Sequence, residues 1–180
     1  MKVQVKMGIS ADDLFDSIVT SVLYDVEQAR GKKVSAKKLK AGFTYQKTLN
    51  AKLGGAQHVT TKITEFEPPR LYAASITSSR GVNTVRYEIE PIEGQDAISV
   101  VYEEGYEGDK TLNDLNGKLM GTLYSPFAKR KIKKRLRDME AYIKANGASV
   151  RDDESDSVSA NGELPEESQS AAVNAAESEE

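Results

Sequence analysis

The feature that most constrains the fold is a long run of apolar and basic residues from about Asp109 to Gly147. Lys and Arg fill the positions between apolar residues that recur at helical spacing, which are Leu112, Leu115, Leu119, Leu123, Phe127, Ile132, Leu136, Met139 and Ile143. A helix of this length cannot bury its apolar stripe alone. The rest of the chain must therefore supply a surface on which it lies.

Pro126 divides this run. Proline is poorly tolerated inside a helix but is accepted in its first turn, and Ser125 just before it is suited to a cap. We expect one helix from about Lys110 to Tyr124, then a bend, and a second helix from about Pro126 to Ala145. Gly147 closes the second helix.

The segment before this run predicts an antiparallel sheet. Between about residues 43 and 107 apolar residues recur every second position, in five stretches separated by glycine and proline. Short connections between consecutive strands favour an antiparallel meander. The separators are Gly54-Gly55, Pro68-Pro69, Gly81, Pro91 and Gly94.

The N-terminal segment predicts one more strand and a helix. Lys2 to Met7 alternates between polar and apolar residues, as in a half-buried strand. Ser10, with Asp13 three residues later, is typical of a helix cap, and the helix should run to about Arg30. Gly31 supplies its end, and a short helix is expected from Ser35.

Charge divides the chain into two parts. Residues 151–180 contain ten acidic residues and one basic residue, so the first 150 residues carry a net charge of +6. The acidic segment is poor in aromatic residues, and we expect it to be disordered. The predicted organisation is a domain over residues 1–147, followed by an acidic disordered tail over 148–180.

Composition also excludes several classes of protein. The chain has no Cys, so disulfides, thiolate metal sites and a cysteine nucleophile are excluded. It has no stretch of about 18 apolar residues and no signal-peptide pattern at its N-terminus, so we expect a cytoplasmic protein. No motif predicts a metal or a cofactor.

A resemblance to known proteins supports this fold. The order of strand, helical segments, meander and C-terminal helix is similar to the helix-grip fold of the START, Bet v 1 and polyketide-cyclase-like (SRPBCC) superfamily, and KITEFEPPRLYAAS resembles its recurring hairpin. Two further segments, SIVTSVLYDVEQARGKKVSAKKLKAGFTYQK and KLMGTLYSPFAKRKIKKRL, resemble a bacterial family known as domain of unknown function 3284. The likeness covers roughly residues 1–145. It implies a cavity between sheet and helix that often holds apolar ligands, and it brings no catalytic residues.

The predicted fold is therefore α+β and helix-grip, with a curved antiparallel sheet of about six strands packed on a long C-terminal helix. Tyr45, Tyr87 and Tyr102 fall on strands, where they either fill the core or line a ligand cavity. Leu119 and Leu123, on the helix, would line the same cavity. These five residues are the candidate ligand site.

The second candidate is a cationic surface. Seven of the nine residues from 129 to 137 are cationic: Lys129, Arg130, Lys131, Lys133, Lys134, Arg135 and Arg137. Three interpretations of this run are open. The cations could form an ordinary solvated helix face, or a surface that binds anionic lipids, or a surface that the acidic tail covers. A nucleic-acid partner is not expected, because no nucleic-acid-binding module accompanies them.

Other titratable residues give weaker signals. His58, the single histidine, lacks neighbours suited to catalysis and is expected on the surface of a strand. Strand alternation places Glu88, Glu90, Glu103 and Glu107 on the solvent side and makes Glu104 the one inward carboxylate. The sequence therefore favours a non-enzymatic module that binds a small apolar or amphipathic ligand. The alternative is a peripheral membrane or interaction protein that uses the basic helix.

Overall fold

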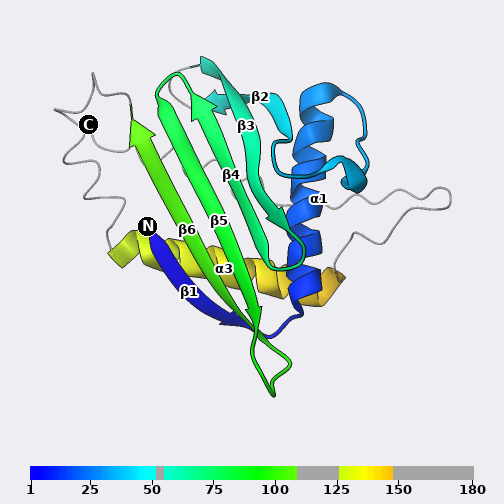
Figure 1. Ribbon diagram of the computed structural model, residues 1–180. Helices are drawn as coiled ribbons and strands as arrows, with labels where there is room; N and C mark the ends of the chain where they lie inside the picture. Colours follow the sequence, from blue (N-terminus) through cyan, green and yellow to red (C-terminus); the bar gives the residue numbers. More distant parts are fainter. Residues whose placement is uncertain (52–54, 109–125, 148–180) are drawn as a thin grey trace.

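The computed structural model describes residues 1–51, 55–108 and 126–147. Its centre is one curved antiparallel sheet with the strand order β1-β6-β5-β4-β3-β2 (Figure 1). The strands are β1 (Lys2–Met7), β2 (Thr44–Ala51), β3 (Gly55–Glu67), β4 (Leu71–Ser78), β5 (Gly81–Pro91) and β6 (Ile98–Gly108). Strands β2 to β6 form the predicted meander, and β1 joins its far side by pairing with β6.

The first helix, α1 (Ala11–Arg30), begins and ends as the sequence predicts. The Ser10 hydroxyl accepts a hydrogen bond from the Asp13 N–H at 3.0 Å. Gly31 has a left-handed backbone with φ of 65°, and its N–H donates to the Glu27 carbonyl at 2.8 Å. A short 3-10 turn, η1 (Ala36–Lys38), follows Ser35.

The hairpin between β4 and β5 requires glycine at Gly81. Its φ is 149°, and a Cβ atom there would lie 2.3 Å from the Glu107 carbonyl oxygen of β6. Side chains other than glycine rarely adopt this backbone. The close approach holds the first residue of β5 against the last residues of β6, as the pairing of Gly81 with Gly108 also shows.

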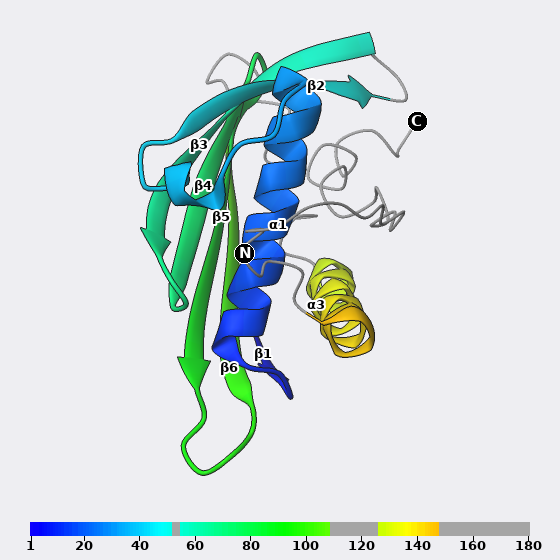
Figure 2. The same cartoon turned by 90° about the vertical axis from the view of Figure 1, so that its right-hand side faces the viewer.

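The second described helix, α3 (Pro126–Asn146), matches the second helix that the sequence predicts. Both helices lie on the same face of the sheet, with α1 against the sheet and α3 crosswise to α1 (Figure 2). Ile132, Leu136 and Ile143 of α3 are buried and join the core between helices and sheet. The architecture is α+β and helix-grip, as predicted.

Several predictions lie outside the described residues. These are the helix from Lys110 to Tyr124, the bend before Pro126, Leu119 and Leu123, and the acidic segment over residues 148–180. Neither of the two long helices that the structure describes is apolar enough over a sufficient length to cross a bilayer.

Candidate functional site

A row of aromatic side chains crosses the helix-covered face of the sheet. Phe66 pairs with Tyr72, Tyr72 with Tyr87, and Tyr87 with Tyr102 as direct cross-strand neighbours on β3, β4, β5 and β6. The ring centroids along the row are 6.5, 6.4 and 4.9 Å apart. Edge-to-face and tilted contacts at these distances are favourable for aromatic rings. The row forms an apolar wall that carries three hydroxyl groups.

The phenols of this row are neutral at physiological pH. Burial raises the pKa of Tyr87 to about 12 and raises the pKa values of Tyr72 and Tyr102 as well. Among the residues that the structure describes, none forms a hydrogen bond with these three hydroxyls. Their oxygen atoms are not fully buried, so they remain accessible to solvent or to a bound group.

Tyr45, the third predicted tyrosine, has a different environment. Its hydroxyl donates to the Asp25 carboxylate of α1 at 3.2 Å, and the Lys47 ammonium donates to the same carboxylate at 2.6 Å. The Lys47 and Asp25 side chains are only 13% and 17% exposed. Tyr45 therefore ties β2 to α1. The Thr61 hydroxyl beside it on β3 is the one buried side-chain polar atom without a partner in the described part of the chain.

Glu104 carries the carboxylate predicted to point inward. It pairs across the sheet with Val85, is half-buried, and follows Tyr102 by two positions on β6. Burial raises the pKa of Glu104, while Arg135 and the N-terminal ammonium act in the opposite direction. Within the described ranges the carboxylate forms no hydrogen bond or ion pair. It is an unpaired acid next to the tyrosine row.

Arg135 differs from the other six cations of the basic run in its burial. It is the half-buried member of the seven, and it lies on α3 beside the buried residues Ile132 and Leu136. Its charge lowers the pKa of Glu104 and opposes the burial effects at Tyr87 and Tyr102. Arg135 therefore lies at the edge of the buried side of α3, where its side chain is partly exposed and its charge acts on Glu104.

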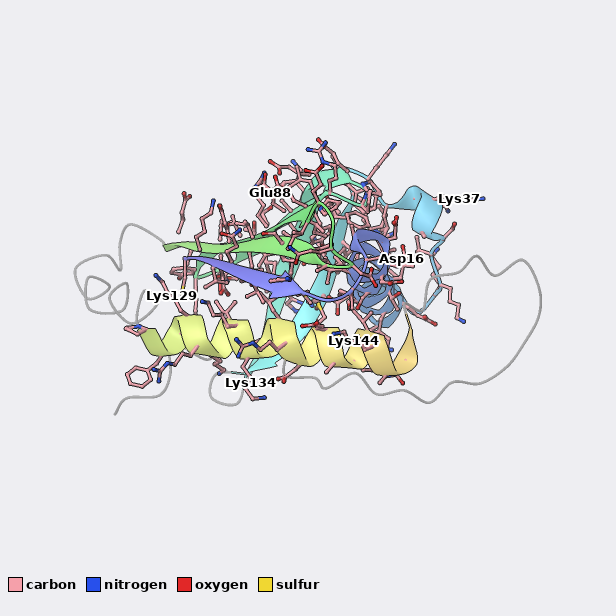
Figure 3. All side chains as sticks on the ribbon, turned by 90° about the horizontal axis from the view of Figure 1, so that it is seen from below. Asp16, Lys37, Glu88, Lys129, Lys134 and Lys144 are labelled. Atoms are coloured by element: carbon pink, nitrogen blue, oxygen red, sulfur yellow. The ribbon has the colours of Figure 1, made fainter. Side chains whose placement is uncertain are left out.

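The remaining six cations are exposed, as expected for a surface. Lys134, which points away from the sheet in Figure 3, forms an exposed pair with Asp138 at 2.7 Å. Phe127, near the start of α3, is 77% exposed. The outward side of α3 thus combines positive charge with an exposed aromatic ring.

Other titratable residues do not assemble a reactive site. His58 is exposed, as predicted, with its Nδ1 atom 3.2 Å from the Thr48 hydroxyl. A hollow of about 460 Å³ is lined in part by Lys2, Arg86, Glu103 and Glu104. The first three are paired, because Lys2 contacts Glu103 at 2.6 Å and Arg86 contacts a glutamate on β3 at 3.1 Å. No acidic or histidine cluster suited to a metal occurs among residues 1–51, 55–108 and 126–147.

The comparison with protein families confirms the predicted family over a shorter range than the expected residues 1–145. The family described as "Domain of unknown function (DUF3284)" matches residues 1–125. The chain belongs to the DUF3284 family. No curated protein matches this DUF3284 chain.

Solved structures share its fold at low sequence identity. A conserved protein from Geobacillus kaustophilus is 12% identical with a TM-score of 0.51, over 80% of this chain and 94% of that one. The protein TTHA0849 from Thermus thermophilus is also 12% identical with a TM-score of 0.51, over 81% and 97%. Ara h 8.0201 is 15% identical with a TM-score of 0.49, over 81% and 97%. The first two likenesses, at 12% identity, concern the fold alone.

The structure brings together part of the predicted ligand site of this DUF3284 chain and adds to it. Tyr87 and Tyr102 are neighbours, whereas Tyr45 belongs to a separate cluster with Asp25. Tyr72 was missed by sequence reasoning, although its alternation with Ala74 and Ile76 is the signal that could have found it. The combined arrangement offers aromatic walls with polar groups at one end, which suits binding of an amphipathic molecule.

Proposed function

We propose that this chain is a non-enzymatic binding module that holds a small amphipathic ligand between its sheet and its C-terminal helix. We also propose that it belongs, through its helix-grip fold, with the START, Bet v 1 and polyketide-cyclase-like proteins. The observation that carries the ligand proposal is the row of tyrosines whose hydroxyls lack partners among the described residues. Ligand sites typically combine apolar walls with a few polar groups that fix orientation.

Binding fits the site better than catalysis does. General acid–base chemistry needs a proton donor and a proton acceptor held around the reacting atoms. Glu104 is the inward carboxylate of the described strands, and His58, the single histidine, is exposed beside Thr48. The half-buried carboxylate next to two phenols instead supplies polar contacts for a bound group.

A cavity-filling substitution tests this proposal in the full-length chain. Val85 faces the helices between Ala74 and Glu104, and Val82 lies on the opposite face of the same strand. The fluorescent probe N-phenyl-1-naphthylamine should bind the unaltered chain. Val85→Trp should weaken that binding at least tenfold, because the indole occupies the ligand's space, while Val82→Trp should leave it unchanged.

Circular dichroism spectra of both variants show whether they retain the fold. Mass spectrometry of an organic extract from the purified unaltered chain provides a second measurement that needs no variant. If the probe does not bind and no apolar molecule is extracted, the ligand proposal is wrong.

A second candidate function is binding of α3 to an anionic membrane surface. Its support is the exposed Phe127 ring beside six exposed cations. Basic amphipathic helices bind anionic lipids through charge and inserted apolar side chains, and salt weakens the charge contribution.

Vesicle co-sedimentation of the full-length chain tests this candidate. Vesicles that contain phosphatidylserine should bind the chain at low salt, and phosphatidylcholine vesicles should not. The triple variant Lys129→Gln, Arg130→Gln, Lys131→Gln should lose this binding. A matched control removes three exposed cations elsewhere, at Lys32, Lys33 and Lys37. Equal losses in both triple variants would show a general charge effect and contradict a specific role for α3.

A further inference from the structure

Four polar groups converge at one end of the tyrosine row. They are the hydroxyls of Tyr87 and Tyr102, the carboxylate of Glu104 and the guanidinium of Arg135. The ring centroids of Tyr87 and Tyr102 are 4.9 Å apart across β5 and β6, and Glu104 follows Tyr102 by two positions on the same face of β6. Half-buried Arg135 lies on the side of α3 that buries Ile132 and Leu136 against the sheet, and its charge acts on all three groups. In the described part of the chain, none of the four forms a hydrogen bond or an ion pair with a protein group.

These four groups are withdrawn from the surface but stay within reach of solvent. Tyr102 is only 7% exposed, and Glu104, Tyr87 and Arg135 are half-buried. Thr61 Oγ1 is the one fully buried side-chain polar atom without a partner in the described ranges, so the polar atoms of these four groups remain accessible. Accessible polar groups without protein partners are available to hydrogen-bond a group from outside the protein.

We infer that this end of the ligand site binds a neutral group that presents a hydrogen-bond donor beside an acceptor, as a primary carboxamide does, in preference to a carboxylate or an ammonium group. The inference rests on the proposed ligand-binding function. It adds the chemical class of the ligand's polar end.

The choice follows from the charges of the two ionisable groups. An ionised Glu104 only accepts hydrogen bonds, and Arg135 only donates them. A carboxylate would satisfy Arg135 but would face Glu104 with a like charge and no donor. An ammonium group would satisfy Glu104 but would face Arg135. A carboxamide supplies an acceptor for the guanidinium and a donor for the carboxylate.

The tyrosines do not oppose this choice. A neutral phenol both donates and accepts, so Tyr87 and Tyr102 contribute hydrogen bonds to either half of the group. Sites built to hydrogen-bond a particular group reject analogues that leave their own polar groups unpaired. Selectivity should therefore depend on Glu104 and Arg135 more than on the phenols.

Three probes of equal chain length test the inference in the full-length protein. Decanamide, decanoate and decylamine are titrated as competitors of N-phenyl-1-naphthylamine at pH 7. The unaltered chain should bind decanamide at least tenfold more tightly than either charged compound. Glu104→Gln should improve decanoate binding at least tenfold, and Arg135→Gln should do the same for decylamine.

A matched control uses the neighbouring carboxylate on the other face of β6. Glu103 pairs with Lys2 on the solvent-facing side, so Glu103→Gln should change none of the three affinities. Glu104→Gln should gain affinity for decanoate, and Arg135→Gln should gain affinity for decylamine. A general loss of structure cannot produce these two gains, because it would lower the affinity for every compound.

The possible results distinguish failure of the carboxamide preference from failure of the proposed ligand-binding function. If the naphthylamine binds but Glu104→Gln leaves the decanoate affinity within twofold, the inference is wrong and the ligand-binding function stands. Preference of the unaltered chain for decanoate or decylamine also overturns the inference. If neither the naphthylamine nor any decyl compound binds, both proposals fail.

Discussion

The backbone N–H of Gly8 donates a hydrogen bond to the Glu140 carboxylate at 2.8 Å, across 132 residues of sequence. The same carboxylate oxygen accepts from the Lys144 ammonium at 2.7 Å. These contacts lower the pKa of Glu140, with the Lys144 hydrogen bond as the largest cause. They attach α3 to the turn between β1 and α1.

Removal of this attachment should destabilise the fold. Glu140→Ala should reduce the free energy of unfolding in urea by about 1–3 kcal/mol at pH 7, because the Gly8 N–H loses a charged acceptor. The pKa of Glu140 is lower in the folded state than in the unfolded state. Its contribution to the free energy of unfolding is therefore complete above the unfolded pKa and is lost as the pH falls through the folded pKa. Asp138→Ala is the control, because that side chain pairs with Lys134 at an exposed site on the same helix. Its effect should stay within about 0.5 kcal/mol.

The apolar side of α3 should contribute more to stability. Leu136 is 3% exposed and packs in the core between the helices and the sheet. Leu136→Ala should lower the free energy of unfolding by about 2–5 kcal/mol, since it removes buried methyl groups and leaves a cavity. Lys133→Ala, at an exposed position nearby, should have little effect in the same urea titration. Similar small losses for both variants would contradict a core role for α3.

The raised pKa of Glu104 predicts a particular dependence of stability on pH. The folded state holds this proton more tightly than the unfolded state, so stability falls as the pH rises from the unfolded value near 4.5 through the raised folded value. Glu104→Gln removes this loss. The variant should therefore raise the melting temperature at pH 7 more than at pH 4, and an equal change at both values would contradict an ionised, half-buried carboxylate. Arg135 and the N-terminal ammonium oppose the shift without reversing it.

The buried phenols predict a loss of stability in alkali. Burial raises the pKa values of Tyr45, Tyr72, Tyr87 and Tyr102 above the ordinary value of 10.0. The unfolded chain loses these protons first, so stability should fall as the pH rises above about 10. Absorbance of the phenolates of these residues should increase together with the loss of the circular dichroism signal. Full ionisation in a chain that keeps its native spectrum would show that the phenols are accessible.

Deletion of residues 151–180 should leave the melting temperature almost unchanged. Their acidic composition gives them little apolar area to bury against the domain. Differential scanning calorimetry of the full-length and shortened chains checks this, and a large decrease would show that the tail packs on the domain.

Much of the fold could be predicted from local patterns. The period of two gave the strands of the meander, Ser10 and Gly31 predicted the ends of α1, and Pro126 and Gly147 those of α3. These signals depend on a few neighbouring residues, because caps and strand alternation are local properties. Alternation along β6 also predicted that Glu104 points inward.

The candidate site was harder to predict because its parts come from distant segments. The basic run shows seven cations in nine residues, and helical spacing puts Arg135 beside the apolar stripe of Ile132 and Met139. The residues of the sheet that this side of the helix meets cannot be predicted from the spacing. The orientation of Arg135 follows from the burial of Ile132 and Leu136 against a surface that only the folded chain provides. The cross-strand row through Tyr72 similarly depends on the register between β4 and β5.

The pairing of β1 with β6 has a consequence for folding. Lys2 and Glu103 are direct partners, and the meander strands that lie between them in sequence pair locally. Contacts between distant segments form slowly because a long loop must close first. During synthesis at about 5–20 residues per second, β1 would wait roughly 5–20 s for its partner to emerge. Val3, Val5 and Met7, which are buried in the folded chain, would be accessible to a chaperone throughout that interval.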